Sequence, residues 1–282
     1  MAQRIDRLGD IAEGYDVVFC DVWGVLHNGI DYFTEAGDAL IAARGRGQSV
    51  VLVTNSPRPS PGVQSQLRLI GVPDEAYDRI VTSGDVTRTL IAEGPKTVYL
   101  LGPERDMPLL EGLDVACVPA AEAECVVCTG FFDDENETPA HYQDMLQAFI
   151  DRGVPMICAN PDLVVERGDR IIPCAGSIAA YYRSLGGETR IAGKPHEPIY
   201  KAALAAARSL RGEVNLARII AIGDGMATDV RGALDGGLDV LYISGGIHAA
   251  EYLADGRLDE DLLQAFLQRH DAHARYWMPR LG

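Results

Sequence analysis

Positive charge is scarce in this sequence. Its 282 residues include 25 lysines and arginines against 41 aspartates and glutamates, which gives a formal net charge of −16. Nucleic acids and anionic lipid surfaces bind basic protein faces, because association releases counterions from their phosphates. The charge balance therefore argues against both as partners, although it leaves room for a local basic pocket.

The sequence also lacks a disulfide framework and a membrane-spanning segment. Its six cysteines lie mostly inside apolar runs, which is typical of buried thiols in a reducing compartment. No stretch approaches the about 20 apolar residues that cross a bilayer, and residues 1–16 lack the apolar core of a signal peptide. We therefore expect a cytoplasmic protein, whose apolar fraction of 47% can form a core of its own.

Short β-branched runs alternate with helical patterns along the chain. This order favours an α/β fold, in which a parallel sheet is joined by crossover helices, over a sandwich or a helical bundle. We expect buried strands at residues 17–20, 50–53, 218–222 and 240–243, and helices at residues 34–45, 198–210 and 227–234.

A second alternating series begins near residue 85. It contains expected strands at residues 97–101, 125–129 and 155–159, and a helix at residues 141–151. The strong strand and helix patterns of the first series resume after it. We therefore expect a core domain formed by residues 1–84 and 188–282, into which residues 85–187 insert as a second domain.

Three of the apolar strands end in polar residues. Asp21 follows the first strand, Thr54 to Ser56 follow the second, and Asp224 follows the strand at residues 218–222. In open α/β sheets ligands bind at the carboxyl ends of strands, so we expect these groups to share one crevice. Asp21 and Asp224, with Asp229 one turn further on, form an all-oxygen set that suits Mg²⁺.

Four segments of the chain resemble, in order and spacing, the motifs of the haloacid dehalogenase (HAD) superfamily. They are DVWGVL at residues 21–26, TNS at 54–56, GKP at 193–195 and GDGMATD at 223–229. The intervals resemble those of its class IIA phosphatases, which include nitrophenyl-phosphatase-like and sugar-phosphatase-like enzymes. The resemblance covers residues 16–246 and implies a Rossmann-like, doubly wound core with a large α/β cap inserted between the second and third motifs.

The resemblance implies a phosphoryl-transfer site around magnesium. Asp21 is identified as the nucleophile that attacks phosphorus and becomes an aspartyl phosphate. Asp21, Asp224 and the backbone carbonyl of Trp23 would hold Mg²⁺, and Asp229 would be a further ligand or would orient the others.

The remaining motif residues are implied to bind the substrate. Thr54, with the neighbouring Asn55 and Ser56, would hydrogen-bond the phosphate oxygens. Lys194 would place a positive charge against the phosphoryl oxygens and the nucleophile. The segment that begins at Asn160-Pro161-Asp162 resembles part of the cap of this group, which makes Asn160 and Asp162 candidate contributors to substrate choice.

Trp23 departs from the pattern of the phosphatases that this chain resembles. Two residues after the nucleophile they carry a second aspartate, which protonates the leaving alkoxide. The indole N–H of Trp23 has no pKa suited to that transfer. General acid–base catalysis typically raises a rate 10²–10⁴-fold. Ordinary phosphomonoesters should therefore be hydrolysed slowly, while the hydrolysis of esters with good leaving groups should be little affected.

Three interpretations of Trp23 stay open. The protein is a phosphatase that recruits another acid, His27 or His196, or acts on a substrate whose leaving group needs no proton. We expect His27 to be a solvated turn residue and His196 to cap a helix. The second interpretation is a dehalogenase-type displacement on carbon, which the extra carboxylates disfavour because they repel a haloacid anion. The third is an impaired enzyme that binds a phosphorylated ligand without turnover.

The sequence thus predicts a magnesium-dependent HAD phosphatase that acts on a small phosphorylated metabolite. It does not identify that metabolite, and it leaves homo-oligomer formation open, because no coiled-coil heptad or long apolar edge marks an interface.

Overall fold

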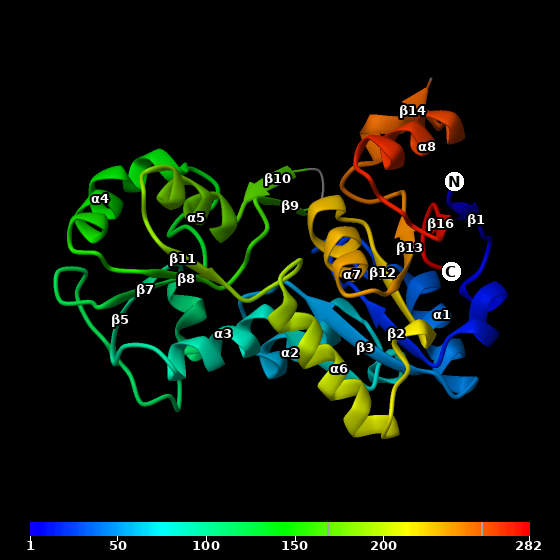
Figure 1. Ribbon diagram of the computed structural model, residues 1–282, viewed down its shortest axis with the longest axis horizontal. Coiled ribbons are helices and arrows are strands. Elements are labelled where there is room, and N and C mark those ends of the chain that lie inside the picture. Colours follow the sequence, from blue (N-terminus) through cyan, green and yellow to red (C-terminus); the bar gives the residue numbers. More distant parts are fainter. Residues whose placement is uncertain (168–169, 255) are drawn as a thin grey trace. The chain divides into compact units, whose positions relative to one another are not determined.

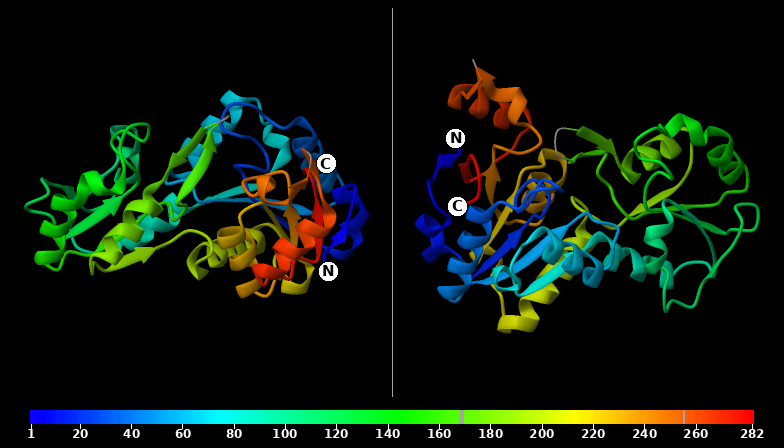
Figure 2. Two further views of the ribbon diagram at one scale, coloured as in Figure 1. Left: turned by 90° about the horizontal axis from the view of Figure 1, so that it is seen from above. Right: turned by 180° about the vertical axis from the view of Figure 1, so that it is seen from behind.

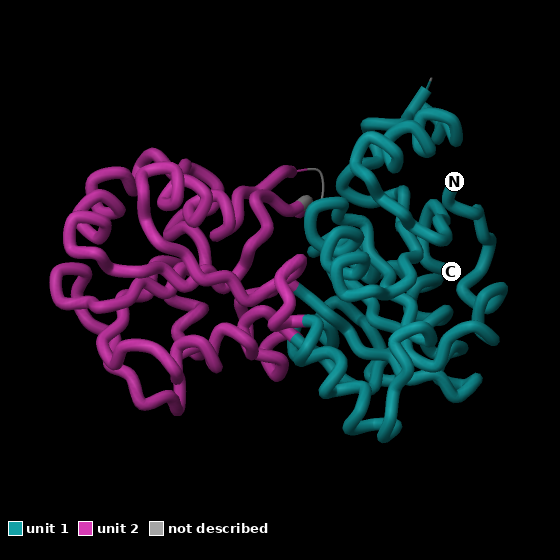
Figure 3. Tube along the Cα trace, in the orientation of Figure 1, with its two compact units in different colours: residues 1–54, 64–81, 200–282 teal, residues 55–63, 82–199 magenta. Residues whose placement is uncertain are grey.

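The computed structural model of the protein describes residues 1–167, 170–254 and 256–282. It divides into two compact units, coloured separately in Figure 3. Unit 1 comprises residues 1–54, 64–81 and 200–282, and unit 2 comprises residues 55–63 and 82–199. The units are defined by compactness alone, so the domain boundaries inferred above, after residues 84 and 187, stay a prediction.

Unit 1 is built on a seven-stranded sheet in the order β1-β16-β13-β12-β2-β3-β4. Its strands β2 (Val17–Cys20), β3 (Ser49–Thr54) and β12 (Ile219–Gly223) lie side by side in Figure 1 and are buried at every residue. Such continuous apolar runs are what a parallel sheet covered on both faces requires. The other strands are β1 (Gln3–Arg4), β4 (Arg79–Thr82), β13 (Asp239–Ile243) and β16 (Tyr276–Met278).

Helices pack against this sheet through apolar faces. Helix α1 (Thr34–Gly45) has the predicted bounds and buries Ala36, Leu40 and Ala43, which recur with helical spacing on one side. The helices that lie wholly or mostly in unit 1 also include α2 (Ser60–Ile70), α6 (Glu197–Arg211), α7 (Arg231–Asp235) and α8 (Glu260–Arg269). Shorter elements are the 3-10 helices Leu8–Gly14, Asp74–Ala76, Leu216–Arg218 and Ala249–Tyr252, and the hairpin of β14 (Leu253–Ala254) and β15 (Arg257–Leu258).

Both ends of the chain lie in unit 1, as Figure 3 shows, and they are marked N and C in all views of Figures 1 and 2. Strand β1 pairs in parallel with β16, and the backbone N–H of Leu8 donates to the carbonyl of Gly282 at 2.8 Å. The first and last residues thereby close one edge of the sheet.

Unit 2 has a five-stranded parallel sheet of its own, in the order β11-β8-β7-β5-β6. Its strands are β5 (Thr97–Leu101), β6 (Ala116–Cys117), β7 (Cys125–Cys128), β8 (Met156–Cys158) and β11 (Thr189–Ile191). Its helices are α3 (Ser83–Ala92), α4 (Gln143–Asp151), α5 (Ala175–Ser184) and the 3-10 helices Glu104–Leu109 and Pro139–Tyr142. An antiparallel hairpin joins β9 (Val164–Arg167) to β10 (Arg170–Pro173).

The unit 2 sheet is covered on both faces. Strand β7 sends Val126 and Cys128 into one apolar cluster and Cys125 and Val127 into another, as alternation along a strand requires. All six cysteines are free thiols, and all except the exposed Cys117 are buried. The two parallel sheets with their helices confirm the predicted α/β class.

None of the helices in the described ranges combines the length and the apolar character needed to cross a membrane.

Replacing Leu52 of β3 with alanine should lower the free energy of unfolding by about 2–5 kcal/mol, because the side chain is fully buried and its removal leaves a cavity. The matched control is Leu69→Ala on α2, where the side chain is 88% exposed and the expected change is within about 0.5 kcal/mol. Equilibrium urea unfolding of both variants measures the difference. Equal losses would show that β3 does not lie in the core.

Candidate active site

Three buried carboxylates meet at the carboxyl end of the unit 1 sheet. Asp21 directly follows β2, Asp224 follows β12, and Asp229 lies in the π-helical turn Met226–Val230. One ligand atom of each lies within 4.8 Å of the others. The strand order changes direction at this point, because β2 is followed by β3 and β4 on one side while β12 is followed by β13 and β16 on the other. Such a switch point is the usual ligand site of an open α/β sheet.

Backbone N–H groups hold each carboxylate in place. Asp21 Oδ1 accepts from Val22 N–H at 2.7 Å, and Asp224 Oδ2 accepts from Ile247 N–H at 2.9 Å. Asp229 Oδ2 accepts from Gly225 N–H at 3.1 Å. These bonds fix the direction of the carboxylate oxygens.

Two glycines leave room for Asp224. A Cβ added to Gly24 would lie 2.3 Å from Asp224 Oδ2, and one added to Gly246 would lie 2.0 Å from the same atom. Gly24 also has a φ of +83°, which side chains disfavour. The sequence identifies Gly24 only as part of a motif, and Gly246 reads equally well as a turn residue, so the contact itself appears only in the structure.

Thr54 lies in the same unit as the three carboxylates. It is the last residue of β3, the neighbour of β2, and it is buried. The structure therefore places Thr54 at the carboxyl end of the strand beside the one that Asp21 follows. The other candidate substrate-binding residues, Asn55, Ser56, Asn160, Asp162 and Lys194, belong to unit 2.

Asn55 connects the segments that carry these unit 2 candidates. Its Oδ1 accepts from Lys194 N–H at 2.7 Å, and its Nδ2 donates to the Lys194 carbonyl at 3.2 Å and to Asp162 Oδ1 at 2.8 Å. Asn160 Oδ1 in turn accepts from Asp162 N–H at 3.0 Å. A Cβ at Gly193 would lie 2.5 Å from Asn55 Oδ1. The Asn55 side chain therefore positions the lysine backbone and Asp162.

Trp23 is held by the residues that follow it. Its indole lies edge-on to the His27 ring, with centroids 5.1 Å apart and planes at 67°. Gly29 packs against the same indole, where an added Cβ would lie 2.5 Å from Cζ2 of Trp23. The half-buried indole thus has a fixed orientation two residues after Asp21.

The expectation that His27 is a solvated turn residue is wrong. His27 is 2% exposed, and burial lowers its pKa to about 4. Its Nδ1 accepts from Gly29 N–H at 2.8 Å. The ring is therefore neutral near pH 7 and is unsuited to replace the missing acid. His196, the other candidate, is exposed directly before α6, and burial of part of its ring together with the charge of Arg183 lowers its pKa.

The carboxylate cluster fits a divalent cation. Three like charges this close in a buried place repel each other strongly unless a cation offsets them. Oxygen ligands without histidine or cysteine suit hard ions such as Mg²⁺ or Ca²⁺. Among the residues that the structure describes, this is the one cluster of three such groups that could hold a metal.

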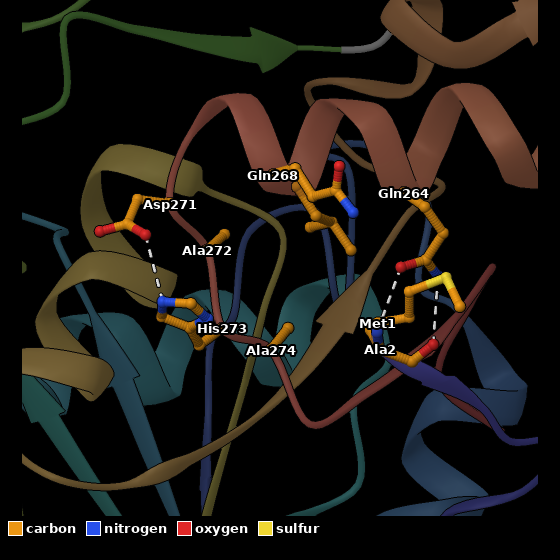
Figure 4. A pocket seen from close by; sticks show the side chains of 9 residues that line it. Met1, Ala2, Gln264, Gln268, Asp271, Ala272, His273 and Ala274 are labelled. Carbon is orange, nitrogen blue, oxygen red and sulfur yellow. Dashed lines mark hydrogen bonds and ion pairs between the residues drawn. The ribbon is translucent and has the colours of Figure 1, made fainter.

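A cavity of about 410 Å³ in unit 1 shares no residue with the carboxylate cluster. Figure 4 shows Gln264 of α8 hydrogen-bonded to the backbone of Ala2, and Asp271 paired with His273 at 3.1 Å. Its lining consists of Met1, Ala2, Gln264, Leu267, Gln268, Asp271, Ala272, His273 and Ala274. No predicted site residue lines it.

Comparison with known proteins yields consistent matches. A family model described as haloacid dehalogenase-like hydrolase matches residues 18–116, and a HAD-hydrolase-like model matches residues 191–267. A crystal structure of a haloacid dehalogenase-like hydrolase from Brucella suis is 54% identical, with a TM-score of 0.89 over 99% of this chain and 100% of that one. The 5′-nucleotidase YutF of Bacillus subtilis is 25% identical over 86% of this chain and 91% of its own length. The dihydroxyacetone phosphatase of Corynebacterium glutamicum is 28% identical, over 70% and 69%.

Magnesium chloride should raise the thermal unfolding temperature of the wild-type protein, because the cation relieves repulsion among the three carboxylates. Asp224→Asn removes one ligand and should abolish most of that rise, while the metal-free variant should unfold no earlier than the wild type. Asp235→Asn, an exposed residue on α7, is the matched control and should keep the full rise. Equal rises in the two variants would rule out a metal at this cluster.

Proposed function

The chain belongs to the haloacid dehalogenase superfamily, class IIA, and we propose that it is a magnesium-dependent phosphatase that hydrolyses a small phosphorylated metabolite. The observation that carries this proposal is the buried cluster of Asp21, Asp224 and Asp229 at the switch point of the unit 1 sheet. Two relatives are named as a 5′-nucleotidase and a dihydroxyacetone phosphatase, which supports hydrolysis of a phosphate ester as the reaction class.

In this proposal the three carboxylates and the backbone carbonyl of Trp23 hold Mg²⁺. When bound, the ion supplies positive charge that offsets the charge of the phosphoryl oxygens. The N–H groups of Val22, Ile247 and Gly225 keep the carboxylate oxygens in place before the ion and the substrate arrive. Little reorganisation is then needed during the reaction.

Asp21 is the proposed nucleophile. Its carboxylate is already ionised at neutral pH and forms a bond to phosphorus as the bond between phosphorus and the alcohol oxygen breaks. The product is an aspartyl phosphate and an alkoxide that must gain a proton. Water then attacks the same phosphorus atom, which releases inorganic phosphate and restores the Asp21 carboxylate.

Residues of the second and third motifs bind the phosphoryl group in the proposal. Thr54, Asn55 and Ser56 supply hydrogen-bond donors, and Lys194 supplies a point charge. Asn55 supports this role indirectly, because its side chain fixes the Lys194 backbone. Asn160 and Asp162 contribute to the choice of substrate. Asn55 Nδ2 donates to Asp162 Oδ1, and the same side chain also bonds the Lys194 backbone, so Asn55 connects these two segments.

The position two residues after Asp21, where similar phosphatases carry the aspartate that protonates the leaving alkoxide, holds no acid in this chain. Trp23 occupies it, and its indole is clamped by His27 and Gly29. A neutral, buried His27 cannot take over the proton transfer near pH 7. We therefore propose that the enzyme prefers phosphate esters whose leaving group departs without protonation. A dehalogenase-type reaction fits less well, because three carboxylates would repel a haloacid anion.

The missing acid also favours a second candidate function, binding of a phosphorylated ligand without turnover. The clamped indole then serves as an apolar wall of the site. Hydrolysis of nitrophenyl phosphate, an ester with a good leaving group, separates the two candidates. Turnover that needs Mg²⁺ supports the phosphatase, whereas stabilisation by phosphate ligands without turnover supports the binding protein.

A cytoplasmic location is part of the proposal. Six free thiols in the structure suit a reducing compartment. A small phosphorylated metabolite as substrate suits the same compartment.

Asp21→Asn should lower kcat for nitrophenyl phosphate by at least about 10³-fold, because the amide cannot form the covalent intermediate. Asp38→Asn, an exposed position on α1, is the control and should keep wild-type activity. Steady-state release of nitrophenol with Mg²⁺ measures both. Activity that survives in Asp21→Asn would refute the nucleophile assignment.

Trp23→Asp should restore acid catalysis and should raise kcat/KM for alkyl phosphates by about 10²-fold relative to Trp23→Asn. Asparagine has nearly the same shape as aspartate but cannot donate the proton. Both variants also lack the indole, so their difference measures the effect of the acid alone. The two variants should differ little on nitrophenyl phosphate, whose leaving group needs no proton. If they are equally active on every ester, the acid is supplied from elsewhere.

A further inference from the structure

His248 lies in the loop that follows β13, beside the segment that carries two of the three carboxylates. Two consecutive residues of this loop contact that segment. The N–H of Ile247 donates to Asp224 Oδ2 at 2.9 Å, and the ring Nε2 of His248 accepts from the backbone N–H of Met226 at 3.4 Å. Met226 begins the π-helical turn that carries Asp229. All of these residues belong to unit 1, and none of the sequence motifs includes His248.

The N–H group of Met226 depends on an acceptor from outside its own turn. The first N–H groups of a helical segment have no acceptor within that segment. Met226 is 6% exposed, so solvent has little access to it. A buried N–H group without an acceptor is costly. The imidazole of His248 supplies the acceptor, from a loop about twenty residues further along the chain.

The orientation of the His248 ring is fixed by its other neighbours. Its Nδ1 lies 3.2 Å from Oε1 of Glu251, in the 3-10 helix Ala249–Tyr252, and Oε2 of Glu251 pairs with Arg269 at 2.8 Å. The Phe266 ring packs against the imidazole, with centroids 5.2 Å apart. Because Nε2 accepts from Met226, the ring proton lies on Nδ1 and is donated to Glu251.

A buried aromatic cluster holds the loop in place from the other side. The Tyr252 hydroxyl donates to the carbonyl of Ser244 at 2.7 Å, and the hydroxyls of Tyr242 and Tyr252 lie 3.0 Å apart. Both tyrosines are fully buried, and Tyr252 is edge-on to Phe266 with centroids 5.2 Å apart. The position of the loop from Ser244 to His248 is therefore set by the protein core.

The bond to His248 orients one peptide group of the carboxylate segment. The N–H of Met226 and the carbonyl of Gly225 belong to the same planar peptide. That carbonyl accepts from Val230 N–H at 3.0 Å, which closes the turn around Asp229. The N–H of Gly225, one residue earlier, donates to Asp229 Oδ2 at 3.1 Å. Fixing this peptide therefore also fixes the backbone between Asp224 and Asp229.

We propose that His248 is a positioning residue of the carboxylate cluster, which holds the Met226–Val230 turn through the Met226 N–H and thereby keeps Asp224 and Asp229 in place for a divalent cation. The inference rests on the proposed function in one respect, that this cluster binds Mg²⁺. Residues that orient metal ligands typically change metal affinity 10–100-fold when they are replaced.

The test separates the acceptor atom from the ring. His248→Phe keeps a ring against Phe266 but has no acceptor. His248→Gln has no ring, but its side-chain oxygen can accept near the position of Nε2. In a MgCl₂ titration followed by thermal unfolding, the phenylalanine variant should need at least about tenfold more Mg²⁺ than the wild type for half of the rise in unfolding temperature. The glutamine variant should stay within about threefold of the wild type.

His270→Phe is the matched control, because His270 packs against the same Phe266 ring, with centroids 4.6 Å apart, and is exposed. It should keep the Mg²⁺ dependence of the wild type. Unfolding without Mg²⁺ verifies that each variant folds. If His248→Phe does not fold, His248→Met takes its place, since methionine matches glutamine in length and is only a weak acceptor. The proposal is overturned if the variant without the acceptor binds Mg²⁺ as the wild type does, if the glutamine variant is equally impaired, or if the His270 variant loses as much.

Failure of the metal proposal gives a different result. If MgCl₂ does not raise the unfolding temperature of the wild type, the magnesium site proposed above fails, and hydrogen–deuterium exchange without added metal tests His248 alone. The amides of residues 224–230 should exchange at least about tenfold faster in His248→Phe than in the wild type, and at nearly the wild-type rate in His248→Gln and His270→Phe. Equal exchange in all four proteins, or equally fast exchange in the two phenylalanine variants, overturns the inference.

Discussion

The repulsion among three buried carboxylates is the constraint around which unit 1 is organised. Asp21 follows β2, Asp224 and Asp229 both follow β12, and one ligand atom of each lies within 4.8 Å of the others. Backbone N–H groups orient the oxygens, and glycines at positions 24 and 246 leave the space that Asp224 needs. Such an arrangement costs stability unless a cation offsets the charges, so the buried cluster favours a bound divalent cation.

Much of this arrangement could be predicted from the sequence. Apolar runs that end in polar residues mark buried parallel strands, and the topology of an open sheet brings their ends together. Burial outside regular elements was harder to predict. His27 precedes Asn28 and Gly29 and reads as a turn residue, yet it is buried against Trp23.

Trp23 and His27 depend on each other, because their rings are in contact. The indole fills the place of an acid, and the imidazole that supports it loses its own ability to act as an acid, because the burial that fixes the ring also lowers its pKa to about 4. A change at either residue therefore alters both. In the proposed mechanism the pair supplies a rigid apolar surface beside Asp21 in place of proton transfer, which restricts the reaction to esters whose leaving group needs no proton.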